Sequence, residues 1–190
     1  VFPNPDCPPH FGAEGRDPQF SGFTKLMRYG NQVSHLLCGA KHEADVAIVY
    51  HAELEWCNGA SSMLTQVPAK ILYEQQIDFD ILPFDALASA NVEDGLLRVN
   101  EETYKALLVP GCAALPEALL AILQRLENAG LPVWFVEERP KEADFGLVVS
   151  QACLAEEAKK FATVHIAPAN PLLRVYRAQR EADWIYMLVN

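Results

Sequence analysis

A cysteine and a histidine at the ends of two predicted strands are the first candidates for chemistry. Cys112 follows Pro110-Gly111 and precedes a predicted helix, whose dipole would lower the pKa of a thiol. His51 follows another predicted strand and could serve as the base of a Cys-dependent hydrolase or transferase. The sequence favours a blander role for Cys112, as a small residue packed under its loop, because none of the five histidines is clearly placed to activate it.

A second candidate is a set of carboxylates in the loop that begins at Glu137. Glu137 and Glu138 could form an acid/base pair with His51 and Glu53 across the edge of a sheet. In an acidic protein, however, carboxylates in loops are common. We therefore expect a solvated loop in which Arg139 neutralises a neighbouring carboxylate.

Aromatic and cysteine residues complete the candidates. Trp56 could stack on a sugar ring, together with Tyr50, although packing against a neighbouring domain is an equally good interpretation.

The five cysteines form no CxxC pair and no zinc-type cluster, which indicates reduced thiols in a cytoplasmic protein. Neither GxGxxG nor GxxxxGK[ST] is present. We expect no nucleotide, no metal and no other cofactor.

Residues 105–140 predict the unit that positions these side chains. Residues 105–109 form a short apolar run typical of a strand buried on both faces. Pro116 lies near a helix start, and leucines then recur every three or four residues until Gly130 and Pro132 end the helix. Residues 133–136 predict a second buried strand. A strand, a helix and a parallel strand make a βαβ unit.

The remaining elements are expected to pack around this unit. A helix is predicted from a cap at Ser21 to Gly39, another around Pro68, and a short one at residues 154–161, with a loop or short helix at 85–95. Further strands are predicted at residues 45–50, 79–84, 96–99, 146–150 and 164–167. Residues 172–177 and 184–189 predict an antiparallel hairpin bridged by AQREAD. In an open parallel sheet ligands bind beyond the carboxyl ends of the strands, where loops 51–62, 110–114 and 137–140 lie.

Composition narrows the class of protein. Half the residues are apolar, as in ordinary globular proteins, and the net charge of −10 argues against nucleic-acid or anionic-membrane partners. No apolar run approaches the roughly 20 residues that span a bilayer, and no signal peptide is visible. The chain begins with Val1 and stops after the apolar run 184–189, so we expect an internal fragment of a larger protein.

Four segments together resemble a known family: ADVAIVYHAELEW, IDFDILPFDAL, YKALLVPGCAALP and LENAGLPVWFVEERP. Their order is similar to the class I glutamine amidotransferase-like domain inside bacterial glycoside hydrolases of the α-L-rhamnosidase type, and to the trimerisation domain of some β-galactosidases. The resemblance implies a three-layer, flavodoxin-like parallel sheet with helices on both faces, plus the C-terminal hairpin. It also implies a linker from a catalytic barrel at residues 1–19, the α/β domain at 20–170, and the start of a β domain at 171–190.

The chain departs from that family at the catalytic positions. Active amidotransferases carry a nucleophilic cysteine in a G-x-C-x-G turn after the strand that matches residues 132–136, where this chain has Glu137 without flanking glycines. The family's His-x-Glu pair is also missing, because Ile166 and Ala167 follow His165. Cys112 lies one loop earlier, near the family's oxyanion loop. Without nucleophile and base, glutaminase activity is not expected.

We therefore expect a non-catalytic accessory domain of a larger glycoside hydrolase. It would dock on the catalytic domain of its parent chain, with self-association as a further role. The catalytic carboxylates of the parent enzyme would lie outside this chain. His51, Glu53 and Trp56 are the residues expected to face carbohydrate or the neighbouring domain, with Cys112, Glu137 and Arg139 as further contact candidates. The alternatives are a small hydrolase or amidotransferase that uses Cys112 with His51, and a carbohydrate-binding module that uses Trp56 and Tyr50.

Overall fold

The computed structural model describes residues 18–52, 54 and 62–190. Its contacts divide the chain into two compact units, residues 1–40 and 41–190, each of which is described by itself. Among the described residues, none of the helices combines the length and the apolar character needed to cross a bilayer.

The first unit contains helix α1 (Phe20–Leu37), as its apolar stripe predicts. The helix begins two residues earlier than a cap at Ser21 predicts, so Ser21 lies inside it and the predicted Ser21 cap is wrong. Gln19 occupies the N-cap position, with no capping hydrogen bond from its side chain. Gly39 has φ of 72°, the left-handed conformation that ends a helix. No residue of α1 is buried.

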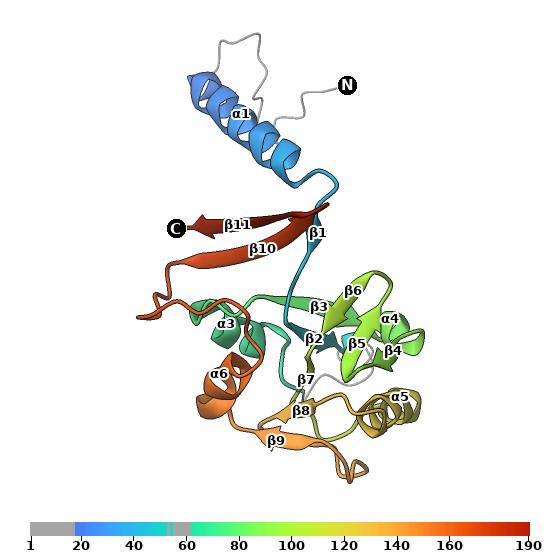
Figure 1. The fold of residues 1–190 in the computed structure, drawn as a ribbon. Helices are drawn as coiled ribbons and strands as arrows, with labels where there is room; N and C mark the ends of the chain where they lie inside the picture. Colours follow the sequence, from blue (N-terminus) through green and yellow to red (C-terminus); the bar gives the residue numbers. More distant parts are fainter. Residues whose placement is uncertain (1–17, 53, 55–61) are drawn as a thin grey trace, which may run out of the picture. The chain divides into compact units, whose positions relative to one another are not determined.

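The second unit is built on a five-stranded parallel sheet, which confirms the predicted α/β class (Figure 1). The strands lie side by side in the order β3-β2-β7-β8-β9, and every neighbouring pair is parallel. Their bounds are β2 Val46–Tyr50, β3 Phe79–Pro83, β7 Ala106–Pro110, β8 Val133–Val136 and β9 Leu147–Val149. The central strands β2 and β7 carry no charged residue, as burial on both faces requires.

Alternate residues of the central strands enter two separate cores. Ala47 and Val49 of β2 pack in one cluster with helices α4 (Phe84–Ala88) and α5 (Glu117–Asn128). Val46 and Ile48 pack in the other with helices α3 (Gln66–Glu74) and α6 (Gln151–Lys159). Figure 1 shows α3 and α6 on one side of the sheet and α4 and α5 on the other. The predicted βαβ unit is confirmed as β7, α5 and β8.

Two small antiparallel sheets complete this unit. One contains β4 (Asn91–Glu93), β5 (Leu96–Val99) and β6 (Glu102–Tyr104). The other, which we call the hairpin sheet, has the order β1-β10-β11 and contains β1 (Lys41–His42), β10 (Arg174–Arg180) and β11 (Asp183–Val189). The predicted C-terminal hairpin is therefore confirmed.

Two sequence predictions are corrected here. Most of AQREAD belongs to the strands rather than to a long connection, because Arg180 pairs with Asp183 across a two-residue turn. The strand predicted at residues 164–167 does not form. The preceding Thr163 is instead tied by its backbone N–H to Asp45, and Pro168, which has no N–H, limits pairing after it.

Candidate functional site

The sheet has a topological switch point between β2 and β7. The chain leaves β2 through α3 toward β3, and leaves β7 through α5 toward β8 on the opposite side. Ligands of open parallel sheets bind at such a point, beyond the carboxyl ends of the strands. His51 follows β2 and Cys112 follows β7, so this edge is where the predicted chemistry would be located.

The Cys112 thiol is poorly suited to nucleophilic attack. The residue is 1% exposed, and a single bridge joins its backbone to Ser62. Burial, and secondarily the negative charge of Glu138, raises the pKa of the thiol to about 12. At neutral pH such a thiol stays protonated, whereas reactive cysteines have a depressed pKa.

A close backbone approach holds the Cys112 loop against the end of β8. A Cβ at Gly111 would overlap the carbonyl oxygen of Val136, so only glycine fits there without a shift of the backbone. The Gly111 carbonyl also accepts a hydrogen bond of 2.7 Å from the backbone N–H of Met63. The turn that was a candidate oxyanion loop is thus packed against its neighbours.

His51 is completely buried, and neither of its ring nitrogens hydrogen-bonds to any residue that the structure describes. It therefore makes no hydrogen bond to the Cys112 thiol, and the predicted Cys-His pair is not assembled in the described part of the chain. Glu53 and Trp56, the other candidates in this loop, lie outside the described residues. Tyr50, the partner proposed for Trp56 in sugar stacking, is 39% exposed.

The side chains of Glu137 and Arg139 both form hydrogen bonds with backbone groups that follow β8. Glu137 has φ of 68°, a left-handed backbone unusual for a residue with a side chain, and it makes the sharp turn that follows the strand. Its carboxylate accepts a hydrogen bond from the backbone N–H of Gln151, the first residue of α6. The Arg139 guanidinium donates to the carbonyls of Phe145 and Gly146, at 3.1 and 3.2 Å, and it forms no ion pair with a carboxylate among the described residues.

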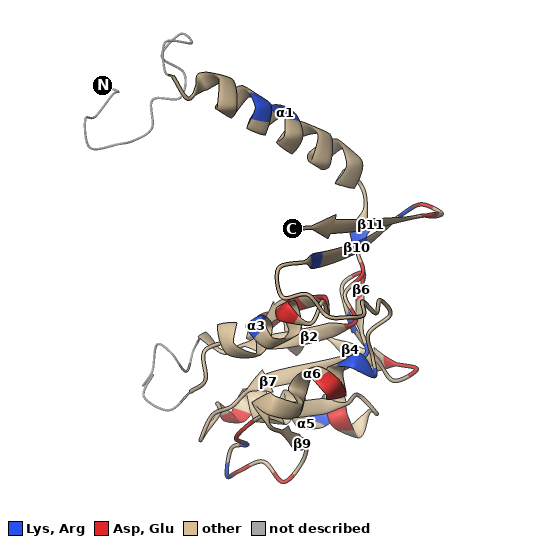
Figure 2. Ribbon diagram, turned by 90° about the vertical axis from the view of Figure 1, so that its left-hand side faces the viewer, with Lys and Arg blue, Asp and Glu red and all other residues tan. Residues whose placement is uncertain are grey.

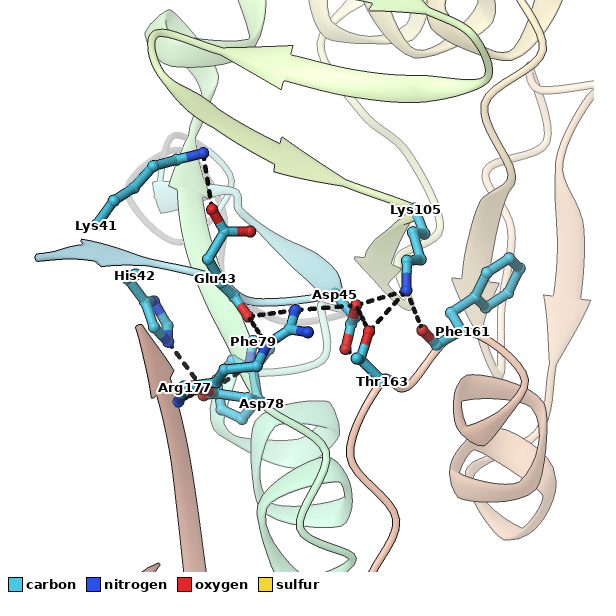
Figure 3. Close-up of polar contacts among 10 residues, drawn as sticks. All are labelled: Lys41, His42, Glu43, Asp45, Asp78, Phe79, Lys105, Phe161, Thr163 and Arg177. Carbon is cyan, nitrogen blue, oxygen red and sulfur yellow. Dashed lines mark hydrogen bonds and ion pairs between the residues drawn. The ribbon is translucent and has the colours of Figure 1, made fainter. Parts of the chain in front are cut away.

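The richest polar constellation lies at the opposite, amino end of the sheet, and sequence reasoning missed it. We call it the amino-end network: Asp45 before β2, Lys105 before β7, Thr163, and Arg177 on β10 (Figure 3). Lys105 Nζ lies 2.7 Å from Asp45 Oδ1. Thr163 donates to the same carboxylate from both its N–H and its hydroxyl, each at 2.7 Å.

Arg177 joins the hairpin sheet to this network. Its guanidinium donates to the Glu43 carbonyl from Nε at 3.0 Å and from Nη2 at 2.8 Å, and Nη2 also lies 3.4 Å from Asp45 Oδ1. Burial by itself would raise the pKa of the Asp45 carboxyl. The hydrogen bonds from Lys105 and Thr163 together outweigh burial, so the pKa is held below its usual value.

A second cluster, the His42 clamp, fastens β1 to β3. His42 Nε2 lies 2.8 Å from an oxygen of Asp78, and Nδ1 lies 3.0 Å from an oxygen of Asp80. Tyr104 donates its hydroxyl to Asp80 at 3.0 Å, and the ring of Tyr176 stacks on the imidazole with centroids 4.5 Å apart. Because ionised carboxylates only accept hydrogen bonds, both imidazole nitrogens must donate, and His42 is an imidazolium.

The pKa of His42 agrees with this geometry. Burial would lower it, but the hydrogen bonds and charges of Asp78 and Asp80 together outweigh burial and raise the pKa to about 10. Burial and the neighbouring Asp80 also raise the pKa of the Tyr104 hydroxyl. Neither group is poised to exchange protons near neutral pH, as a general acid or base must be.

These two clusters fasten elements of the fold together; they do not present reactive groups. They lie at the amino ends of β2, β3 and β7, the end of a parallel sheet where ligands are not normally bound. A cavity of about 180 Å³, lined by Lys105, Arg177 and Trp184 among others, lies beside the amino-end network. Within the described ranges, no group of three or more His, Cys, Asp or Glu side chains is arranged to hold a metal ion.

Comparison with known proteins adds no relative: no family model, no curated protein and no solved structure matches the chain.

Proposed function

We propose that this chain is a non-catalytic structural domain. One observation carries the proposal: of the described candidates at the carboxyl edge, His51 and Cys112 are buried and Glu137 and Arg139 are engaged in local structure, whereas charged side chains at the amino end link the two sheets. Asp45 and Arg177 from distant parts of the chain fasten the hairpin sheet to the parallel sheet there. We infer that a domain organised in this way serves as a rigid structural element and does not catalyse a reaction.

The finer fold that we propose is the three-layer, flavodoxin-like arrangement. Numbered along the chain, the parallel strands have the order 2-1-3-4-5, which is the flavodoxin-like order. The packing of α3 and α6 in one core cluster, and of α4 and α5 in the other, also supports three layers.

The parent protein that we propose is a cytoplasmic glycoside hydrolase of the α-L-rhamnosidase type. Support for it comes from the resemblance of the four sequence segments. In that setting the domain would dock on the catalytic domain and contribute to self-association, and the parent enzyme would act on carbohydrate. The net charge of −10 supports the proposal that nucleic acid is not a partner.

The alternative Cys-dependent hydrolase has less support, because the Cys112 thiol has a raised pKa and His51 does not hydrogen-bond to it. A carbohydrate-binding module that uses Tyr50 keeps one supporting observation, the exposure of that side chain.

The test is to assay the purified chain with aryl glycosides, glutamine and aryl esters, beside a Cys112→Ser variant. We expect no turnover above the buffer rate with any of the three substrates. Glycoside hydrolysis would refute the proposal directly. Hydrolysis of glutamine or ester that disappears in the variant would refute it in favour of the Cys112 enzyme. Titration with oligosaccharides, followed by tryptophan fluorescence, tests the binding-module alternative.

A further inference from the structure

A small polar cavity lies between the amino-end network and the His42 clamp. Its lining includes Asp45 from the network, Asp78 from the clamp, and also Gln76 and Arg177. Arg177 contacts both clusters: its guanidinium lies 3.4 Å from Asp45, and its backbone N–H donates to Asp78 at 3.3 Å (Figure 3). The space in which the centre of a water molecule can lie is about 10 Å³. That space is enough for a single water.

The lining contains a donor that no described residue uses. Arg177 is only 8% exposed, and its guanidinium carries five N–H bonds. Nε and Nη2 donate to the Glu43 carbonyl, and Nη2 also reaches Asp45. Nη1 takes part in no hydrogen bond with the residues that the structure describes. Because buried donors are nearly always hydrogen-bonded, we expect the partner of Nη1 to lie in the cavity.

Oxygen atoms that can accept further hydrogen bonds belong to the same lining. Among the described residues, Oδ1 of Asp78 accepts one hydrogen bond, from the N–H of Phe79. Oδ2 of Asp45 also accepts one, from the N–H of Thr163, and Oε1 of Gln76 likewise accepts one. Each of these oxygens has two lone pairs. A molecule in the cavity is therefore offered one donor group and several acceptors.

We propose that the cavity binds one water molecule, which accepts a hydrogen bond from Nη1 of Arg177 and donates to oxygens of Asp45 and Asp78. Such a water makes about three hydrogen bonds, the usual number for a buried water. It joins the amino-end network and the His42 clamp into one hydrogen-bonded system. The inference goes beyond the structural role proposed above and does not depend on it, because turnover by the chain would leave the water site unchanged.

Charge and size favour water over an ion or an organic ligand. Acidic and basic residues lie close together where the hairpin sheet meets the parallel sheet (Figure 2). An anion in the cavity would lie against the carboxylates of Asp45 and Asp78, and a cation would lie against the guanidinium of Arg177. Lys105 already lies 2.7 Å from Asp45. The His42 imidazolium lies 2.8 Å from Asp78, so neither carboxylate needs a further cation. The volume leaves no room for an organic molecule.

The first measurement is a crystal structure of the unaltered chain at a resolution that shows ordered water. We expect one peak of density in the cavity, at about 2.7–3.2 Å from Nη1 of Arg177 and within hydrogen-bonding distance of an oxygen of Asp45 or Asp78. A cavity without density would overturn the proposal. Density at about 2.0–2.6 Å from the carboxylate oxygens would overturn it in favour of a metal ion.

The second measurement detects the water in solution. Magnetisation transfer from water to the backbone N–H of Arg177 is measured by NMR in the unaltered chain and in Val175→Ile. Val175 lines the cavity, so the added methylene takes the space of the water. The matched control is Val148→Ile, the same change in β9 at a side chain that is 45% exposed.

We expect the signal of a long-lived bound water in the unaltered chain and in Val148→Ile, and its loss in Val175→Ile with unchanged circular dichroism. Absence of the signal from the unaltered chain would overturn the proposal. A signal that persists in folded Val175→Ile would do the same, because it would then come from a side-chain hydroxyl and not from the cavity. If Val175→Ile does not fold, the density in the unaltered chain decides.

Discussion

The guanidinium of Arg177 lies 3.4 Å from the carboxylate of Asp45, a residue 132 positions earlier in the chain. Asp45 precedes the central strand β2, and Arg177 lies in β10 of the hairpin sheet. Both side chains are about nine-tenths buried, so the contact is shielded from water. Together with Lys105 and Thr163, this pair joins the first and last parts of the second unit.

Removal of the Asp45 charge should destabilise the fold. In Asp45→Asn, the buried Arg177 loses the carboxylate that compensates its burial, and the partly exposed Lys105 loses its ion-pair partner. We expect a loss of about 3 kcal/mol in the free energy of unfolding. The matched control is Glu156→Gln, the same kind of change in the pair that exposed Glu156 forms with Lys159; its effect should stay within about 0.5 kcal/mol. Urea denaturation measures both. Equal effects of the two substitutions would show that the amino-end network stabilises the fold no more than an exposed ion pair does.

The contribution of the His42 clamp to the free energy of unfolding should be lost at alkaline pH. The pKa of His42 is raised from 6.5 to about 10 on folding, so its stabilisation is complete below pH 6.5 and is lost as the pH rises through 10. We expect His42→Gln to cost about 3 kcal/mol at pH 6 and much less at pH 10.5. Urea denaturation at several pH values measures this difference.

The protonation state of His42 can also be observed directly. In ¹⁵N spectra, its imidazole should remain doubly protonated at pH 8. Asp80→Asn, which removes one of the two carboxylates, should lower the pKa at which the ring loses its proton. A ring that titrates near pH 6.5 in the unaltered chain would contradict the clamp.

Cys112 should be chemically inert in the folded chain. Its thiol is buried and has a pKa raised to about 12, whereas Cys38 and Cys153 are exposed. Iodoacetamide at pH 7.5 should label Cys38 and Cys153 and leave Cys112 unmodified until urea is added. Peptide mass spectrometry reads each site separately, so the exposed thiols serve as internal controls. Labelling of Cys112 as fast as Cys153 would restore the nucleophile hypothesis.

Gly111 should not tolerate a side chain. Its Cβ would overlap the Val136 carbonyl oxygen, and we expect Gly111→Ala to destabilise the chain by about 1–3 kcal/mol. The control is Gly30→Ala in α1, where no heavy atom lies within 4 Å of the added Cβ and helix propensity favours alanine by about 1 kcal/mol. Thermal unfolding and circular dichroism compare the two. A neutral Gly111→Ala would mean that the loop can move away from β8.

Much of the parallel sheet could be predicted from sequence because its strands are short apolar runs. The run before Tyr50 and the run before Pro110 lie in the central strands β2 and β7, and the leucine spacing after Pro116 matches α5. In these segments local pattern and tertiary burial agree, so the sequence contains the information needed.

The amino-end network and the His42 clamp could not be predicted in the same way. His42 and Asp78 are 36 residues apart, and Asp45 and Thr163 are 118 apart, and no local pattern pairs them. Their contact depends on strand order, which brings the starts of β2, β3 and β7 to one end of the sheet. The available signal was that Asp45, Asp78 and Lys105 each stand just before a strand. Sequence reasoning looked for function at the opposite edge and left these residues aside.

The measurement that tests the scaffold most directly is amide hydrogen exchange of β10 in the unaltered chain and in Asp45→Asn. We expect β10 amides to be protected as strongly as those of β2 in the unaltered chain. The reason is that the amino-end network makes the hairpin sheet and the parallel sheet one cooperative unit. In the variant, β10 should exchange about 100-fold faster, the factor that a loss of about 3 kcal/mol implies, while β7 and β8 change less. Rapid exchange of β10 in the unaltered chain, or no change in the variant, would contradict the account.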